Sequence, residues 1–305
     1  MKALFPSPLQ GNRAVLLLFL APLFSLLFFR LYKSSPGLFT LLVEATTLLI
    51  VLVWTRLSFA RLRKSSLWTT LPSVKVTFLA LALVLLAGFG AQWALSAFAP
   101  AAWWTQTPSF RSSGSDFPFM LLAVGLVGPF LEELIFRGYL LTGYEKSMSG
   151  FNAALNVSVL FALIHHNPIQ TLGVLPFAWI VTRAVQHTRS LWTSVTLHVI
   201  NNSLLVVLQR VFSSTPRAAT DVVSRLDPFW GYLGLGLVTL TLWGATHWLK
   251  PKPTLERDPL GADEQTPEQT PEQTQVQSGF WSGSLVVVMV VSALALVGAA
   301  LARTA

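Results

Sequence analysis

The stretch FPFMLLAVGLVGPFLEELIFRGYL, residues 117–140, decides the fold class because it is long and almost wholly apolar. Its first twenty residues would extend about 30 Å as an α-helix, which matches the hydrocarbon thickness of a bilayer. The whole chain has this character, since 53% of its 305 residues are hydrophobic and only 11% are charged. Backbone polar groups find no water in lipid, and long continuous apolar runs satisfy them as helices. The sequence therefore predicts an all-α, polytopic membrane bundle.

Similar apolar runs recur along the chain and predict about eight or nine transmembrane helices. The predicted spans are residues 14–29, 38–54, 76–98, 117–136, 151–165, 169–185, 191–208, 229–249 and 285–301. The fifth and sixth spans are short and only a few residues apart. We therefore expect them to form a tight hairpin or to lie partly inside the bundle.

We expect four parts along the chain. Residues 1–112 hold the N-terminal transmembrane helices, and residues 113–250 hold the spans with the polar motifs described below. Residues 251–278 contain a tandem Thr-Pro-Glu-Gln repeat and almost no large apolar side chain, which predicts a disordered linker. Residues 279–305 predict a C-terminal transmembrane helix. The sequence contains no cysteine, which excludes disulfides, thiolate metal ligands and a cysteine nucleophile.

Lys and Arg residues flank several spans and predict the orientation, because positively charged loops tend to stay in the cytoplasm. The expected cytoplasmic residues are Lys2, Arg13, Arg56, Arg61, Arg63, Lys64, Lys146, Arg189, Lys250 and Lys252. On this topology Arg217 and Arg225 fall outside. The net charge of +8 then reflects topology and anionic lipid head groups. The sequence has no basic stripe with interleaved aromatic residues that would predict a nucleic-acid partner, so we expect a multi-pass protein of the plasma (inner) membrane.

Two carboxylates and a guanidinium lie inside the apolar stretch quoted above. An ionisable residue at membrane depth costs about 2.5 to 3.5 kcal/mol on insertion scales and usually marks a functional site. On a helix, Glu133 and Arg137 are four residues apart and can pair, whereas Glu132 points about 100° away. Glu132 is then available as a general base for water. The alternative is that the pair only joins two helices and that Glu132 lies at the level of the head groups.

Two further polar clusters, FALIHHN and LHVINNS, end or interrupt later spans. In the first, His165 and His166 point in different directions, and a histidine near a helix end is often an interfacial side chain. In the second, His198 and Asn202 share one helix face and can form a hydrogen-bond lock between helices. Considered together with the acidic pair, these groups supply a base, a proton carrier and donors for an oxyanion, which suits peptide hydrolysis. They also suit a metal ion with an open water position.

Three motifs occur in a defined order along these spans. They are Glu132-Glu133-x-x-x-Arg137, Phe161-x-x-x-His165 and His198-x-x-x-Asn202. In this order and at these separations they resemble the motifs of the CPBP intramembrane proteases, also called the ABI or CAAX protease and bacteriocin-processing family. The resemblance covers residues 117–208, about a third of the chain, and makes residues 113–250 the expected protease core.

The resemblance implies a role for each motif residue. Glu132 and His165 would activate water, while His198 and Asn202 would form the oxyanion hole. The residues that would support the site are Glu133, Arg137 and Phe161. The family is often described as metalloproteases, so a zinc ion or another divalent metal held by Glu132, His165 and His198 is also consistent with the resemblance.

Three residues depart from the family pattern or have no assigned role. Arg189 stands in the turn before the third motif, where the family carries a glycine. His166 is an additional titratable group beside His165. Glu44 is a lone carboxylate in an earlier span, and either faces the same cavity or hydrogen-bonds across helices.

The expected depths of two site residues conflict. Glu132 comes late in an inward-running span, whereas His165 ends a short span that starts at the cytoplasmic side. A fourth helix that continues to Tyr144, or a fifth helix that starts deep in the bundle, would bring the two side chains level.

We expect an intramembrane endopeptidase that cuts near the terminus of a membrane-associated protein, with the bilayer as its other partner. Prenylated CAAX tails, C-terminal sorting signals and bacteriocin leaders remain open as substrates. The His-Glu-x-x-His, Gly-x-Ser-Gly and Gly-x-Gly-Asp motifs of other intramembrane proteases do not occur in the sequence. The alternatives are a catalytically idle immunity or assembly factor, a proton-coupled transporter, and a b-type haem protein with histidine ligands.

Overall fold

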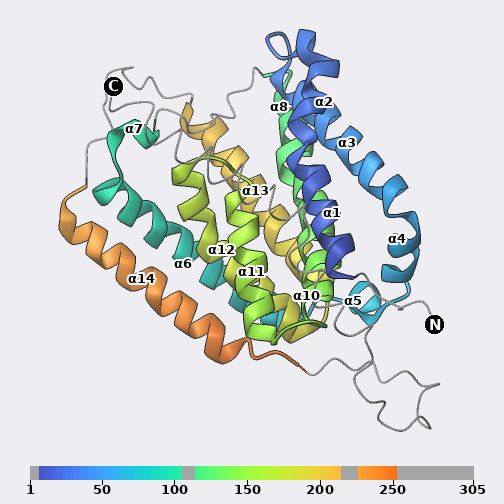
Figure 1. Ribbon diagram of the computed structural model, residues 1–305. Coiled ribbons are helices and arrows are strands. Elements are labelled where there is room, and N and C mark those ends of the chain that lie inside the picture. The colour runs from blue at the N-terminus through green and yellow to red at the C-terminus, as the bar shows by residue number, and fades with distance from the viewer. Residues whose placement is uncertain (1–6, 105–113, 214–225, 253–305) are drawn as a thin grey trace, which may run out of the picture.

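The computed structural model describes residues 7–104, 114–213 and 226–252, and this part of the chain is a bundle of helices without strands (Figure 1). The helices are α1 (Pro8–Phe19), α2 (Ala21–Phe28), η1 (Phe29–Leu31), α3 (Pro36–Trp54), α4 (Arg56–Leu62), α5 (Ser66–Thr69), α6 (Val74–Phe98), α7 (Ala101–Trp104), α8 (Phe117–Leu122), η2 (Ala123–Val127), α9 (Gly128–Glu133), η3 (Leu134–Leu141), α10 (Thr142–Tyr144), α11 (Gly150–Leu163), α12 (Pro168–Thr188), α13 (Leu191–Ser213) and α14 (Pro228–Trp248). The predicted all-α, polytopic membrane fold is confirmed. The predicted last helix, at 285–301, lies outside the described residues, as does nearly all of the predicted linker.

Six helical spans in the described ranges are long and apolar enough to cross a bilayer. They are Pro8–Leu31, Pro36–Trp54, Val74–Phe98, Phe117–Tyr144, Pro168–Thr188 and Leu191–Val211. The fifth predicted span corresponds to α11, which has only 14 residues and would extend about 21 Å. It is therefore too short to cross alone. The total of eight or nine membrane helices stays a prediction.

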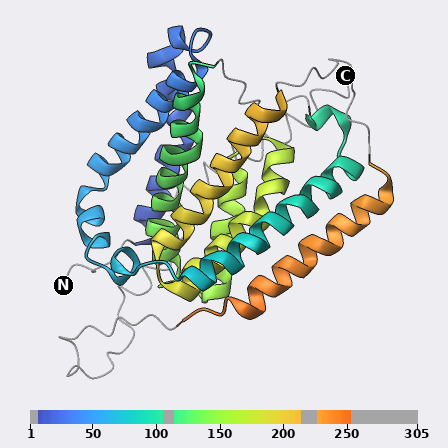
Figure 2. The same ribbon diagram turned by 180° about the vertical axis from the view of Figure 1, so that it is seen from behind.

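On one side of the bundle, α14 lies along α6, away from α1 and α3 (Figure 2). The backbones of these two helices approach closely at Gly90 and Gly234. A Cβ atom added at Gly234 would lie 2.5 Å from the carbonyl oxygen of Gly90. Only glycine permits this approach, because any side chain there would clash with backbone.

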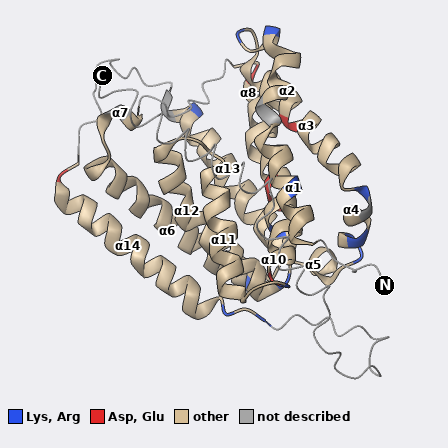
Figure 3. Cartoon of the chain, in the orientation of Figure 1, with Lys and Arg blue, Asp and Glu red and all other residues tan. Residues whose placement is uncertain are grey.

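Lys and Arg residues gather at the end of the bundle where α4 lies, here called the basic end, and further basic segments lie at the opposite end beside α2 (Figure 3). Hydrogen bonds join segments at the basic end. The hydroxyl of Ser190 donates to the carbonyl of Thr70, and the amide of Lys252 donates to the carbonyl of Gln186. Lys2, Arg217 and Arg225 lie outside the described residues, and the orientation stays a prediction.

The helix that carries the first motif runs continuously from Phe117 to Tyr144 and includes two π-helical stretches, η2 and η3. Glu132 therefore lies near the middle of a long helix instead of near its end. The first of the two possible solutions to the depth conflict therefore occurs. The second does not, because α11 starts at the same end of the bundle as Glu145, where the carbonyl of Gly150 accepts a hydrogen bond from Gln186. Its 14 residues are few, so His165 follows within a short distance of that end. π-Helical turns such as those of the long helix are frequent at functional sites.

Asp116 fixes α3 beside the long helix. Its carboxylate accepts hydrogen bonds from the amide of Gly37 at 2.7 Å, the amide of Leu38 at 3.3 Å and the hydroxyl of Ser35. The side chain thus satisfies donors at the start of α3 that the helix itself cannot satisfy. A Cβ atom at Gly37 would lie 2.7 Å from the carbonyl oxygen of Asp116, so the contact also requires glycine.

Replacing Asp116 with alanine should lower the stability of the bundle. The substitution leaves two buried amides and a hydroxyl without an acceptor, at a cost of about 1 to 3 kcal/mol. Thermal unfolding of the detergent-purified protein, followed by tryptophan fluorescence, measures the loss. Asp116→Asn keeps one acceptor oxygen and should lose less. Equal midpoints for wild type and Asp116→Ala would contradict this role.

Candidate active site

The centre of the site is the fully buried carboxylate of Glu133. Its Oε1 atom accepts a hydrogen bond from Nη1 of Arg137 at 2.9 Å and lies 2.8 Å from Nδ1 of His198. Arg137 is also fully buried and donates from Nε to the hydroxyl of Thr182 at 3.3 Å and from Nη2 to the carbonyl of Ala178 at 3.2 Å. The predicted Glu133–Arg137 pair is therefore present, and it links the long helix to α12 and α13.

Phe161 packs against three polar side chains of the site. The guanidinium carbon of Arg137 lies 4.5 Å from the centre of its ring, within the range of a cation–π contact. Its ring centre is 5.7 Å from that of His198 and 5.3 Å from that of His165. Phe161 thus orients one residue of each motif, which explains physically why an aromatic side chain stands at this position.

His198 is held by the acidic pair and is almost completely buried. Because Nδ1 faces the carboxylate of Glu133, that nitrogen carries a proton and donates it to the hydrogen bond. The other ring nitrogen, Nε2, then faces Glu132, whose Oε2 atom lies 3.8 Å away. This separation is too long for a direct hydrogen bond.

Glu132 differs from its neighbour in exposure and in partners. Its side chain is 22% exposed, whereas that of Glu133 is completely buried. Among the described residues, the 3.8 Å contact with His198 is its only ion-pair or hydrogen-bond partner. Two adjacent carboxylates therefore have different environments: one is enclosed and paired, and the other is open at the surface of the site.

The two adjacent histidines separate as their opposed directions predict. Nδ1 of His165 lies 2.9 Å from the carbonyl oxygen of Phe161, so the ring turns back toward the site. His166 has a φ of 51° and packs its ring against Phe19, with 5.1 Å between ring centres. The left-handed backbone conformation of His166 follows the end of α11 at Leu163 and directs its ring to Phe19. Among the described residues, no hydrogen bond or ion pair joins His165 to Glu132.

Asn202 lies on the same helix as His198 but contacts a different level of the long helix. Its Nδ2 atom donates to the carbonyl of Val124 at 3.2 Å, and its Oδ1 atom accepts from Nδ2 of Asn201 at 3.2 Å. The contact between the amides of Asn201 and Asn202 is not predictable from the sequence, because adjacent residues on a helix point in different directions. Thr182 was also not expected in the site, since a threonine inside an apolar span commonly bonds its own helix.

Glu44 approaches the same helix from α3. A Cβ atom added at Gly128 would lie 3.7 Å from the carboxyl carbon of Glu44. Gly128 lies four residues, about one turn, before Glu132. Glu44 therefore borders the site instead of forming a hydrogen bond across helices, since the described residues offer it no such partner.

The donor arrangement does not match the predicted metal site. Across residues 7–104, 114–213 and 226–252, no three His, Asp or Glu side chains lie close enough together to hold a metal ion. Nδ1 of His198 bonds Glu133 and Nδ1 of His165 lies at hydrogen-bond distance from a carbonyl, which leaves Nε2 of each ring as the nitrogen that a metal would bind. The ligand set Glu132, His165 and His198 stays a prediction, and no catalytic step is derived through a metal.

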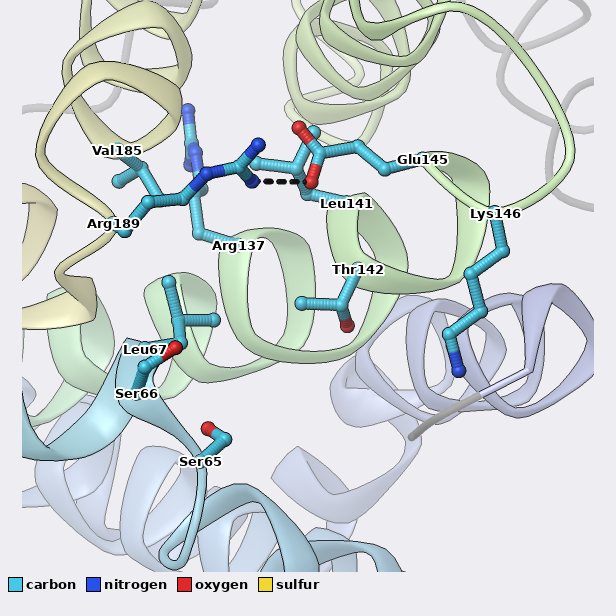
Figure 4. A pocket seen from close by; sticks show the side chains of 10 residues that line it. All are labelled: Ser65, Ser66, Leu67, Arg137, Leu141, Thr142, Glu145, Lys146, Val185 and Arg189. Atoms are coloured by element: carbon cyan, nitrogen blue, oxygen red, sulfur yellow. Dashed lines mark hydrogen bonds and ion pairs between the residues drawn. The ribbon is translucent and has the colours of Figure 1, made fainter. Parts of the chain in front are cut away.

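A separate pocket opens at the basic end of the bundle, on the far side of Arg137 (Figure 4). Its lining residues are Ser65, Ser66, Leu67, Arg137, Leu141, Thr142, Glu145, Lys146, Val185 and Arg189. Arg189 pairs with Glu145 at 2.7 Å and has a φ of 53°, a backbone conformation that favours glycine. Arg189, which stands where the resemblance implies a glycine, therefore has a backbone conformation that glycine favours.

Comparisons with known proteins cover the part of the chain that builds this site. Residues 114–204 match the family model described as type II CAAX prenyl endopeptidase Rce1-like. A segment of 96 residues is 30% identical to the Bacillus subtilis (strain 168) protein named "Putative membrane peptidase YdiL", and covers 30% of this chain and 38% of that protein. No solved structure is significantly similar to the chain. Residues 114–204 are therefore identified as an Rce1-like segment, which confirms the resemblance predicted from the three motifs.

Proposed function

We propose that this protein is an intramembrane endopeptidase in which Glu132 activates the attacking water. The observation that carries the proposal is the contrast between two adjacent carboxylates inside a membrane bundle. Glu133 is neutralised by Arg137 and holds His198, while Glu132 stays partly exposed beside the free nitrogen of that histidine. The similarity of residues 114–204 to a peptidase family supports the same reaction class.

The gap between Glu132 and His198 suits a water molecule. Their facing atoms are 3.8 Å apart, and one water about 2.8 Å from each would hydrogen-bond to both. Glu132 would accept a proton from this water as its oxygen attacks the carbonyl carbon of the substrate. The bond between carbon and nitrogen then breaks, and the proton held by Glu132 passes to the leaving amine.

The negative charge that develops on the substrate oxygen needs hydrogen-bond donors already in position. Asn202 supplies an amide whose orientation is set by Asn201 and by the carbonyl of Val124. Nε2 of His198 faces Glu132 and would hold the attacking water in place, because Nδ1 remains bonded to Glu133. His165 lies next to this group through Phe161 and is suited to carry protons to and from the site.

The proposed substrate is a membrane-associated protein, cut near its terminus at a bond that enters the bundle. The family whose model matches residues 114–204 is described as type II CAAX prenyl endopeptidases, so a prenylated CAAX tail is one candidate substrate, beside a C-terminal sorting signal or a bacteriocin leader. A buried site within a membrane bundle favours a segment that is already anchored in lipid. We place the protein in the plasma (inner) membrane with the basic end in the cytoplasm.

Glu132→Gln should abolish cleavage while the protein stays folded in the membrane. Glutamine keeps the size of the side chain but cannot accept the proton, and a general base commonly contributes about 10²- to 10⁴-fold in rate. The test maps all N- and C-termini in membranes from cells that lack the protein, complemented with wild type or with Glu132→Gln. Termini restored only by wild type would establish proteolysis and identify the substrate.

Complementation by Glu132→Gln with no change in any terminus would contradict the proposal. It would favour a catalytically idle immunity or assembly factor that uses the same fold. His198→Ala provides a second variant of the same site and should also lose cleavage.

Glu133→Gln should instead reduce the amount of folded protein. Removing one partner of a buried ion pair leaves Arg137 uncompensated, at a cost of about 3 to 5 kcal/mol. The thermal midpoint and the yield of folded protein in detergent measure this loss. Glu145→Gln is the matched control, because its pair with Arg189 is partly exposed and such pairs contribute about 0 to 1 kcal/mol. A smaller loss for Glu133→Gln than for Glu145→Gln would disprove the structural role of Glu133.

Cleavage should survive treatment with a metal chelator. In the proposed mechanism Glu132 and His198 hold the water, so removal of divalent ions leaves the base in place. Purified protein is assayed on the identified substrate before and after dialysis against a strong chelator. Loss of activity that returns on addition of zinc would overturn this expectation and restore the metal site predicted from the sequence.

A further inference from the structure

Glu44 belongs to the site by position but lies outside the segment that resembles the peptidase family. It stands on α3, whereas the match covers residues 114–204. Its carboxylate borders Gly128, which lies one turn before Glu132 on the long helix. The nearby Thr47 donates to the carbonyl of Val43 in its own helix, so it does not bind the carboxylate.

The level of Glu44 along the long helix is defined by two flanking contacts. Asn202 bonds the carbonyl of Val124, Glu44 borders Gly128, and Glu132 faces His198. On the long helix, Val124, Gly128 and Glu132 are each separated by four residues, about one turn. Glu44 thus lies between the proposed oxyanion donor and the proposed base, which is the level that the residues flanking the cleaved bond would occupy.

Two contacts place α3 beside the long helix. A Cβ atom at Gly37 would lie 2.7 Å from both the carbonyl oxygen of Asp116 and the amide nitrogen of Met120, and the carboxylate of Glu44 borders Gly128. Asp116 also accepts hydrogen bonds from the amides of Gly37 and Leu38. The start of α3 is thus fixed to the start of the long helix, and Glu44 follows about two turns later.

The site has more negative than positive groups. Arg137 is committed to Glu133, Thr182 and the carbonyl of Ala178. In the described residues no Lys or Arg forms an ion pair with Glu44 or Glu132. Two carboxylates without a permanent cation therefore face the position of the substrate, in surroundings of low dielectric constant where an unpaired charge interacts strongly with an opposite one.

We propose that Glu44 is a specificity-determining residue that selects substrates with a lysine or arginine beside the cleaved bond. The proposal rests on the endopeptidase function above and names its substrate class. A basic side chain would pair with Glu44 while the adjacent carbonyl lies between Asn202 and Glu132. Membrane proteins carry Lys and Arg residues where their anchors meet the cytoplasm, so suitable segments are available next to a bilayer.

The test measures sequence preference with the purified full chain in detergent. The probe is a pool of peptides made by chymotryptic digestion of a membrane proteome, which leaves Lys and Arg residues inside the peptides. New termini are mapped for wild type, Glu44→Gln, Glu44→Lys and the inactive Glu132→Gln. One cleaved peptide is then synthesised with Lys, Gln or Glu at the selected position, and kcat/KM is measured for each version.

Wild type should prefer the Lys peptide over the Gln peptide, and Glu44→Gln should reduce this ratio at least tenfold. Glu44→Lys should reverse the preference and favour the Glu peptide. Glu145→Gln is the control for removal of a distant carboxylate and should keep the wild-type ratio. Because Glu44→Gln is uncharged and nearly the same size, the prediction remains testable even if Glu44→Lys does not fold.

An unchanged ratio in Glu44→Gln would overturn the specificity role, even if the rate fell for all peptides together. In that case Glu44 would act on the reaction itself and not on recognition. If wild type produces no termini beyond those of Glu132→Gln, the endopeptidase function fails and this proposal fails with it. The two failures are therefore distinguishable within one experiment.

Discussion

One buried ion pair, between Glu133 and Arg137, constrains the packing of the central helices. Neither charge is exposed; Arg137 donates to Thr182 and Ala178 on α12, and Glu133 bonds His198 on α13. Burying charges is costly unless every donor and acceptor is matched, so α12 and α13 must adopt one arrangement around the long helix. The same pair orients His198, which means that the structural demand and the proposed chemistry are met by the same contacts.

Depth in the membrane is the second constraint. Side chains from α3 and α13 contact the long helix between Val124 and Glu133, because the lengths and starting points of these helices differ. The long helix contains π-helical stretches, α11 is short, and Asp116 anchors the start of α3. Small residues at Gly37 and Gly128 allow α3 to approach. A one-turn shift, about 5.4 Å, would separate Glu44 from Glu132 and Asn202 from the proposed reaction centre.

The site residues differ in how well their contacts can be predicted from the sequence. The spacing of four residues correctly predicted the pair of Glu133 and Arg137, because a helix brings such positions onto one face. The roles of Glu132, His165 and Asn202 remain predictions, although the structure brings the first and last to the same region. The direction of the Glu44 side chain is not predictable from the sequence, because a lone carboxylate on a distant helix has no partner nearby in the chain.

Composition and local periodicity are sufficient to identify a helical membrane protein and the polar side chains that enter its apolar spans, since lipid excludes unpaired backbone and penalises ionisable groups. Helix packing sets which of the two carboxylates is enclosed and which is partly exposed, and it brings Glu44 beside Gly128 of the long helix. These contacts join helices that are far apart in the chain, and no local pattern encodes that packing.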